Sequence, residues 1–250
     1  MTTPEERAAV ALDRPRDLGA LLSDSFSLYR RHFWTFLAMA VVIVVPVHAI
    51  VLGVGLGQFS GGYDSTDSPA SALVPLLMQF LVVAPLVAVT VLHALKEIEA
   101  GEKPGFGRSI QGGLDAFTPV FWPVLIAVLC EIGVAITVIG LLVLLVRLFF
   151  IPQLVVLEKA RGVEALRASW ELTRGFGLRT AGLLVVGYFT YGFAGALVTT
   201  PLAALARSVD SEAVSLAAGT LGETLVAAPI GIFAALMYFD LRSRKAALAR

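Results

Sequence analysis

The sequence predicts an all-α polytopic membrane protein with six transmembrane helices, and three observations lead to this fold class. Hydrophobic residues make up 57% of the 250 residues and charged residues only 15%, whereas soluble domains carry about 25% charged residues. Long apolar runs recur along the chain, and the longest extends from Val120 to Leu157. Lys and Arg are concentrated in alternate loops, as in proteins that cross the bacterial inner membrane several times.

The N-terminal part predicts an interfacial helix followed by the first span. The segment from Met1 to Arg31 is polar and lacks an apolar core, so we expect no cleavable signal peptide there. Residues 1–17 are expected to form a disordered cytoplasmic segment. Between Leu18 and Trp34 the apolar residues recur along one helical stripe, which is typical of a helix that lies in the membrane interface. The first span then extends from Trp34 to about Gly57, with Pro46 inside it.

The second span is predicted from about Ala72 to Leu95, after a polar turn without Lys or Arg. It carries Pro75 and Pro85, each of which removes a helix hydrogen bond, so we expect a kinked helix. A charged linker follows, and residues 106–117 within it predict a second, weaker amphipathic segment before the third span.

The run from Val120 to Leu157 is too long for one crossing of the bilayer, which takes about 20 helical residues. It predicts two spans joined by a short turn near Ile139 and Gly140. Folding the chain at that turn places Glu131 and Arg147, the two ionisable residues of the run, at similar depth. We therefore expect them to form an ion pair.

The last third of the chain predicts one more interfacial helix and two more spans. The segment from Glu158 to Arg179 has an apolar and a charged face. The fifth and sixth spans are expected at 180–202 and 216–239. Because basic residues are retained in the cytoplasm, both termini are predicted to be cytoplasmic. The membrane domain is expected to cover residues 18–245, followed by a cytoplasmic tail at 246–250.

An internal repeat relates the interfacial segments. Residues 25–30 match residues 169–174 as Ser-aromatic-x-Leu-x-Arg, and 106–117 is a weaker counterpart. These matches predict three units of one orientation, each an interfacial helix followed by a membrane hairpin. A chance origin of the threefold pattern stays open, because few positions match.

Four intramembrane polar residues are candidates for function, since charged groups at membrane depth face a partner or a water-filled cavity. Glu131 and Arg147 form either a structural ion pair, which we favour, or a substrate or proton site. His48 lies after Pro46 and is either a helix-packing residue or a member of that site. Glu223 is expected near the outer headgroup level.

Nothing in the sequence indicates catalysis, a cofactor or a metal site: it contains no P-loop, no HExxH motif and no serine-histidine-acid set on recognisable turns. Cys130 lies in an apolar run and is predicted to be a buried structural thiol. The expected partners are the lipid bilayer, anionic headgroups and a protein of unknown identity, with no nucleic acid.

Three segments, ALRASWELTRG, LVRLFFIPQLVVLEKARG and YFDLRSRK, resemble bacterial, especially actinobacterial, membrane proteins labelled "glycerophosphoryl diester phosphodiesterase membrane domain". The resemblance implies a six-helix membrane domain and no catalytic barrel, because the His-Arg start of that barrel is absent. Its residues here include an interfacial motif of Ser169, Trp170, Arg174, Tyr238, Asp240 and Arg242, together with Arg147, Pro152 and Glu158.

The sequence therefore favours a non-enzymatic protein of the bacterial inner membrane, acting as a scaffold or accessory domain in lipid or envelope metabolism. The alternative is a small-molecule or ion transporter or channel that uses Glu131, Arg147 and His48.

Overall fold

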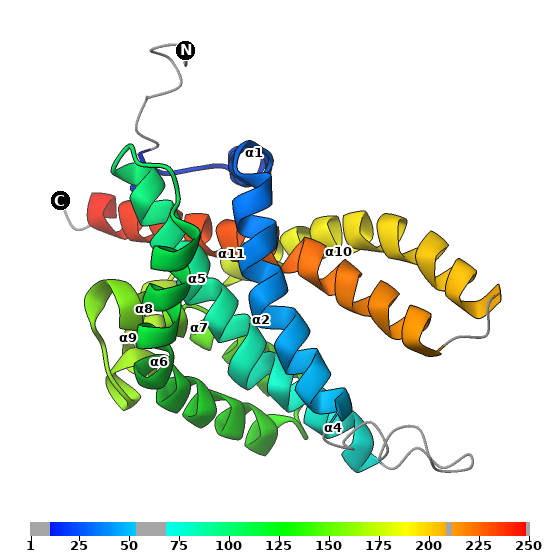
Figure 1. Ribbon diagram of the computed structural model, residues 1–250. Coiled ribbons are helices and arrows are strands. Elements are labelled where there is room, and N and C mark those ends of the chain that lie inside the picture. The colour runs from blue at the N-terminus through cyan, green and yellow to red at the C-terminus, as the bar shows by residue number, and fades with distance from the viewer. Residues whose placement is uncertain (1–10, 54–68, 209–211, 249–250) are drawn as a thin grey trace, which may run out of the picture.

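The computed structural model describes residues 11–53, 69–208 and 212–248, and these residues form helices and no strand (Figure 1). The helices are α1 (Leu18–Arg31), α2 (Phe33–Gly53), α4 (Pro69–Met78), the π-helical turn η2 (Gln79–Val83), α5 (Ala84–Glu99), α6 (Phe106–Val134), α7 (Val138–Leu148), α8 (Ile151–Glu158), α9 (Val163–Thr173), α10 (Gly177–Ser208) and α11 (Glu212–Leu248).

Six helical stretches of the described chain are long and apolar enough to cross a membrane. The predicted number is confirmed, and the chain has the architecture of a multi-pass membrane protein. The stretches are Phe33–Ile50, Val74–Glu99, Phe106–Val134, Val138–Glu158, Gly177–Leu202 and Ala217–Leu248.

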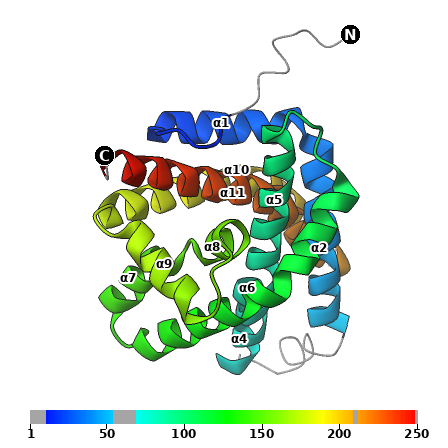
Figure 2. The same ribbon diagram turned by 90° about the vertical axis from the view of Figure 1, so that its left-hand side faces the viewer.

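Helix α1 lies across one end of the bundle. It is seen along its axis in Figure 1, whereas α2 extends away from it, and Figure 2 shows it lengthwise beside the end of α11. The Asp17 carboxylate caps its first turn by accepting a hydrogen bond from the Ala20 amide at 2.7 Å. Its buried face includes Leu21, Leu28 and Tyr29, which confirms the predicted amphipathic helix before the first span.

The segment before α1 is docked on the bundle as far as the structure describes it. Leu12 is fully buried and Arg16 is 2% exposed. The predicted disorder is therefore wrong for residues 11–17, and residues 1–10 lie outside the described chain. The prediction failed because the polar character of this segment comes from side chains that are paired with other elements. At the other end, α11 continues to Leu248, so the predicted tail begins inside a helix.

The second span is irregular near Pro85, one of the two prolines for which a kink was expected, whereas Pro75 lies inside the regular helix α4. A π-helical turn, η2, lies directly before Pro85, and the Ala84 amide donates to the Gln79 carbonyl, five residues back. Pro85 has no amide hydrogen, and a π turn is one way to accommodate that loss within a span. The kink expected from Pro85 is therefore seen as a local change of helix type.

The central apolar run divides into two spans, as predicted, but the turn between them lies at a different place. Helix α6 ends at Val134 and α7 begins at Val138, so the turn precedes the predicted position at Ile139 and Gly140. Helix α6 is also continuous from Phe106, so the interfacial helix predicted before the third span is not a separate element.

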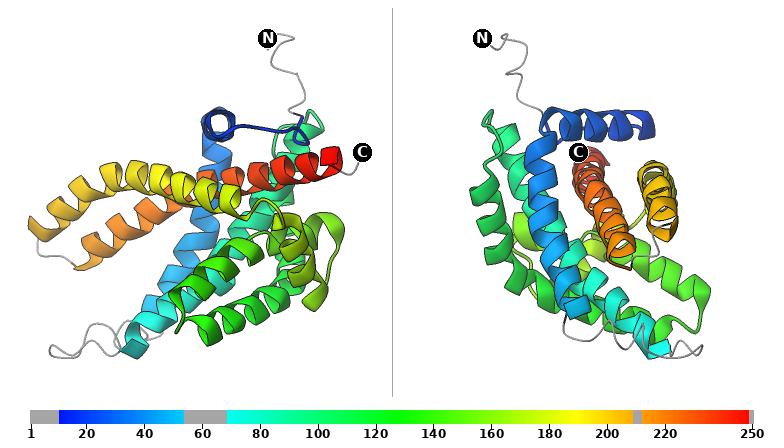
Figure 3. Two further views of the ribbon diagram at one scale, coloured as in Figure 1. Left: turned by 180° about the vertical axis from the view of Figure 1, so that it is seen from behind. Right: turned by 45° about the vertical axis from the view of Figure 1, so that its right-hand side comes forward.

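Helix α11 is the central helix of the fold and packs against α10, α5, α2, α1 and α9. Its apolar window is 78% buried, whereas that of α10 is 22% buried. Figure 3 shows α10 and α11 side by side, with α10 on the outside. Helix α10 therefore exposes large apolar side chains, such as Val185, Phe189 and Phe193, to the surroundings of the protein.

Gly187 permits the close contact between α10 and α11. A Cβ added to Gly187 would clash with the ring of Phe233, whereas one added to Gly192, on the same helix, would meet nothing within 4 Å. We expect Gly187→Ala to destabilise the protein by about 1–3 kcal/mol, the usual cost of overpacking. Thermal unfolding in detergent measures this, with Gly192→Ala as the matched control. Equal melting temperatures for the two variants would contradict this account of the helix contact.

Candidate functional site

A buried carboxylate, Asp240, joins the two ends of the chain. Its Oδ1 accepts hydrogen bonds from the Arg16 amide at 2.7 Å and from Arg244 Nε at 2.8 Å, and its Oδ2 accepts one from Arg179 Nη2 at 3.1 Å. Arg179 and Arg244 also donate to the Arg16 carbonyl, at 2.7 and 2.9 Å. The Asp240 side chain is 0% exposed. We call Asp240, Arg179, Arg244 and the Arg16 backbone the Asp240 cluster.

The Arg16 side chain extends the Asp240 cluster to α1. Its Nε donates to Asp24 Oδ2 at 2.9 Å, and Arg14 contacts the same oxygen at 2.5 Å. Burial raises the pKa of the Asp24 carboxyl, but the hydrogen bonds and charges of Arg16 and Arg14 outweigh burial and hold that pKa below its usual value. The contact therefore stabilises the fold at neutral pH, and this contribution is lost as the pH falls below about 4.

Tyr238 and Arg242, which lie near Asp240 in the segment YFDLRSRK, make contacts of their own. The Tyr238 hydroxyl donates to Glu158 Oε1 at 2.6 Å, which links α11 to the end of α8. Arg242 lies 3.9 Å from Asp13 in an exposed pair. The sequence identified Tyr238, Asp240 and Arg242 as interfacial residues, and the structure shows that Asp240 and Tyr238 reach inward to other elements.

Ser169 satisfies backbone groups at a break in the fourth apolar span. Between α7 and α8 the helix is interrupted at Phe149 and Phe150, which leaves backbone groups without helical partners. The Ser169 hydroxyl donates to the Arg147 carbonyl at 2.7 Å and accepts from the Phe150 amide at 3.3 Å. Helix α9 thus docks on the break, and the Ser-aromatic-x-Leu-x-Arg motif has a structural explanation in this unit.

Arg147 points toward α9, and the predicted ion pair with Glu131 is wrong. Arg147 Nη1 donates to Thr173 Oγ1 at 3.4 Å, and its guanidinium carbon lies 5.1 Å from the centre of the Trp170 ring. Glu131 has no ion-pair partner within 4 Å among the described residues. The earlier turn explains the error, because it leaves Glu131 near one end of the α6–α7 pair and Arg147 at the other.

The other two polar candidates meet each other. His48 Nε2 lies 2.8 Å from Glu223 Oε2, and His48 Nδ1 lies 3.1 Å from Thr220 Oγ1. The second oxygen of Glu223 is buried and has no hydrogen-bond partner among the residues that the structure describes. The pair links α2 to α11 within two of the apolar stretches. His48 therefore pairs with Glu223 and does not join Glu131 and Arg147, the site that the sequence offered for it.

Helix α1 makes two hydrogen bonds that involve a tyrosine, one its own and one on α10, and the sequence indicated neither. The Tyr29 hydroxyl donates at 3.2 Å to the Leu225 carbonyl, which has no helical donor because Pro229 follows four residues later. Burial raises the pKa of Tyr29 to about 12, so it remains a donor. Ser25 Oγ and the Tyr191 hydroxyl are also hydrogen-bonded. These contacts fix α1 to α10 and α11.

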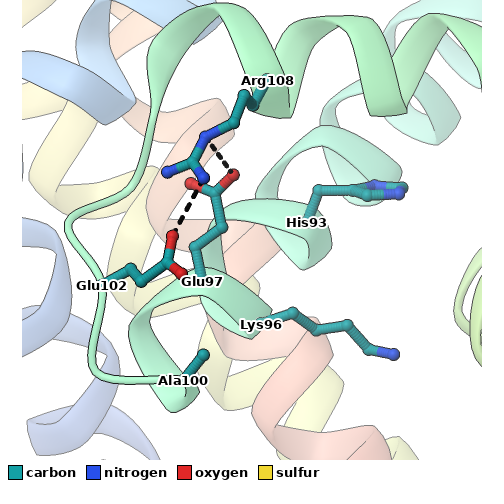
Figure 4. Close-up of a pocket in the computed structure, with 6 residues that line it drawn as sticks. All are labelled: His93, Lys96, Glu97, Ala100, Glu102 and Arg108. Carbon is teal, nitrogen blue, oxygen red and sulfur yellow. Dashed lines mark hydrogen bonds and ion pairs between the residues drawn. The ribbon is translucent and has the colours of Figure 1, made fainter.

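A shallow hollow lies where α5 leads into α6 (Figure 4). Arg108 pairs there with Glu97 at 3.3 Å and with Glu102 at 2.9 Å, while Lys96 points away from them. The Arg108 charge is therefore satisfied within the loop. Among the described residues no group of three or more His, Cys, Asp and Glu side chains is placed to hold a metal ion.

Some of the residues that build these sites could have been found in the sequence and others could not. Arg244 lies four residues after Asp240 on α11, a spacing that the sequence shows. Nothing local shows that Arg16 and Arg179 reach the same carboxylate. Thr220 gave no signal. Cys130, predicted to be buried, is exposed on α6. An apolar setting does not predict burial here, because the lipid-facing surface of a membrane protein is apolar as well.

A family described as a domain of unknown function (DUF7847) matches residues 105–241, which is more than half of the chain. The chain belongs to this family. The DUF7847 match begins at the N-cap of α6 and ends directly after Asp240, so it includes Arg147 and Ser169 but not Arg16 or His48. The Asp240 cluster therefore joins the DUF7847 domain to the segment that precedes α1.

No curated protein and no solved structure matches the chain. The DUF7847 description carries no function, so the resemblance to proteins labelled as a phosphodiesterase membrane domain finds no support in these comparisons.

Proposed function

We propose that the protein is a non-enzymatic scaffold or accessory domain of the bacterial inner membrane, active in lipid or envelope metabolism. The Asp240 cluster is the observation that carries this proposal. It ties the segment before α1 to the starts and ends of membrane helices, and it places more arginines than carboxylates at this end of the molecule. Buried networks of this kind specify one rigid arrangement, which suits a surface that holds a partner or headgroups.

The proposal includes an orientation in the membrane. In it the six apolar helices form three hairpins, and both termini, α1 and α9 lie on the cytoplasmic side. The excess of arginine around Asp240 and Asp24 supports this orientation, because basic residues are retained in the cytoplasm. The described ends of the chain also lie on the same side as α9 (Figure 1).

Cysteine labelling tests the orientation. In a Cys130→Ser background, Ser23→Cys places a thiol on the exposed face of α1, and Ser208→Cys places one at the far end of α10. A membrane-impermeant maleimide is expected to label the α10 variant in intact spheroplasts and the α1 variant only after permeabilisation. The reverse pattern would refute the proposed orientation.

The outward faces of α1 and α9 form the proposed contact surface. Phe26 and Arg30 on α1 and Arg167 and Trp170 on α9 are exposed, while the neighbouring Ser25 and Ser169 are buried. The matched aromatic positions of the two segments, Phe26 and Trp170, are therefore both exposed.

Complementation of a deletion strain tests the scaffold function. The readouts are the phospholipid composition of the membrane and resistance to detergent. A variant with Phe26→Ser and Arg30→Gln is expected to accumulate normally in the membrane and fail to complement, because it lacks the contact surface. A variant with His48→Gln and Glu223→Gln is expected to complement.

Transport is the second candidate, and the His48–Glu223 pair favours it. An ionisable pair within the apolar helices, with one carboxylate oxygen that no described residue contacts by a hydrogen bond, is the arrangement expected of a proton or cation site. Transport predicts the opposite complementation result, with the His48 and Glu223 variant inactive. It also predicts proton flux in liposomes, reported by a pH-sensitive dye and abolished by Glu223→Gln.

A further inference from the structure

The guanidinium of Arg147 lies where α7, α9 and α10 meet. It is held by Thr173 at 3.4 Å and covered on one side by the Trp170 ring at 5.1 Å. No carboxylate of the described chain lies within 4 Å of it. Arg147 therefore carries a charge at the edge of an apolar span without a counter-ion from these residues, an unfavourable state that an anion would relieve.

The first turn of α10 faces the same point. A Cβ added to Gly177, the first residue of α10, would lie 3.7 Å from Arg147 Nη2. The first amides of a helix have no acceptor within the helix and carry partial positive charge. The Arg147 guanidinium and the first amides of α10 are both positive and lie close together. An anion between them would be bound by both, because helix N-terminal amides and arginine side chains both bind phosphate oxygens.

The surroundings of this point are apolar and open. Leu178, in the first turn of α10, is 93% exposed and Trp170 is 40% exposed. Tryptophan is typical of the headgroup level of a bilayer. An anion that reaches Arg147 along this surface would sit beside exposed apolar side chains, which is the situation of a lipid phosphate with its acyl chains.

We propose that Arg147, Trp170 and the first turn of α10 form a binding site for the phosphate of an anionic lipid headgroup. Arg147 and the first amides of α10 donate to the phosphate oxygens, Trp170 covers the guanidinium, and Thr173 holds it in position. The proposal rests on the membrane orientation given above, in which α9 lies at the cytoplasmic interface. Free phosphate has the same chemistry, so the source of the anion must be tested.

The test uses the full chain in detergent with Trp170 as its single tryptophan, after Trp34→Phe and Trp122→Phe at two exposed positions. Dihexanoyl phosphatidylglycerol, dihexanoyl phosphatidylcholine and inorganic phosphate are titrated while the Trp170 emission is measured. We expect Arg147→Gln to weaken phosphatidylglycerol binding by about tenfold or more. Arg174→Gln, directly after the end of α9, removes an exposed charge that pairs with Glu171, and it is expected to change the affinity by less than about threefold.

A second variant keeps the test informative if Arg147→Gln fails to fold. Gly177→Asp places a carboxylate next to Arg147 at a helix start, where an acidic residue is favourable. We expect this variant to be as stable as the unmodified chain and to lose phosphatidylglycerol binding, because the tethered carboxylate occupies the site. Gly177→Asn, with the same shape and no charge, is expected to retain binding.

The outcomes distinguish a lipid phosphate from free phosphate, and they also test whether the anion binds at Arg147. Binding of phosphatidylglycerol in preference to phosphatidylcholine and inorganic phosphate supports the proposal, whereas binding of inorganic phosphate alone overturns the lipid source. Equal phosphatidylglycerol binding by the unmodified chain, Arg147→Gln and Gly177→Asp overturns the site. These measurements use purified protein and test only the phosphate site. The scaffold function is tested separately by complementation, so failure of the site would not by itself refute the scaffold function.

Discussion

Asp240→Ala is expected to destabilise the protein by about 3–5 kcal/mol, the cost of removing one partner from a buried ionic network. The substitution leaves the Arg16 amide and two arginine side chains without their shared acceptor. It also releases the segment before α1, which the Asp240 cluster holds against the bundle. Thermal unfolding of the protein in detergent measures the stability.

Trypsin provides a local readout for the same variant. Arg16 is 2% exposed and is followed by Asp17, whereas Arg14 is followed by Pro15, which blocks cleavage. We expect cleavage after Arg16 to be slow in the unmodified chain and fast in Asp240→Ala, below the melting temperature of either.

Asp13→Ala is the matched control for Asp240→Ala. Asp13 forms an exposed pair with Arg242 at 3.9 Å, and exposed pairs contribute about 0–1 kcal/mol. If Asp240→Ala unfolded at the same temperature as Asp13→Ala and remained protected from trypsin, the Asp240 cluster would not be what holds the N-terminal segment.

Ser169→Ala is expected to have the second largest effect, about 2–4 kcal/mol, because it leaves one buried and one partly buried backbone group without a partner. Without the hydroxyl, the Arg147 carbonyl and the Phe150 amide lose their partner at the break between α7 and α8. Thermal unfolding measures the loss, and faster hydrogen exchange at the Phe150 amide locates it.

Ser23→Ala is the control for Ser169→Ala, because Ser23 is an exposed serine on the other amphipathic helix whose hydroxyl bonds only within its own helix. We expect Ser23→Ala to change stability by no more than about 0.5 kcal/mol. Equal stability of the two variants, with the Phe150 amide still protected, would show that the break does not need the serine.

The pattern of apolar runs predicted the helices well, because each span needs a long apolar sequence and nothing else in the chain has one. Pro85 likewise predicted a local distortion, since the missing amide acts within its own helix. The amphipathic stripe from Leu18 to Arg31 predicted α1, because a helix at an interface must divide its polar and apolar residues between two faces.

Residues that act on distant elements were not predicted correctly. The expected partner of Arg147 was Glu131, and the structure shows Trp170 and Thr173 instead. The connection between α6 and α7 lies about one helical turn earlier than predicted. This shift separates Glu131 from Arg147, because it brings one residue closer to the connection and takes the other farther from it. His48 failed in the same way, since its partner Glu223 lies on the last helix of the chain.

The sequence alone determined that this is an all-helical protein with six membrane-length apolar helices, because both properties follow from local composition and period. Tertiary structure decided that Asp240, besides its helix neighbour Arg244, receives donors from Arg16 and Arg179, which lie far away in the chain. It also decided that Arg147 faces α9 and the start of α10. The physical reason is that an apolar run fixes where a helix forms, whereas packing and the exact position of each turn fix which side chains meet.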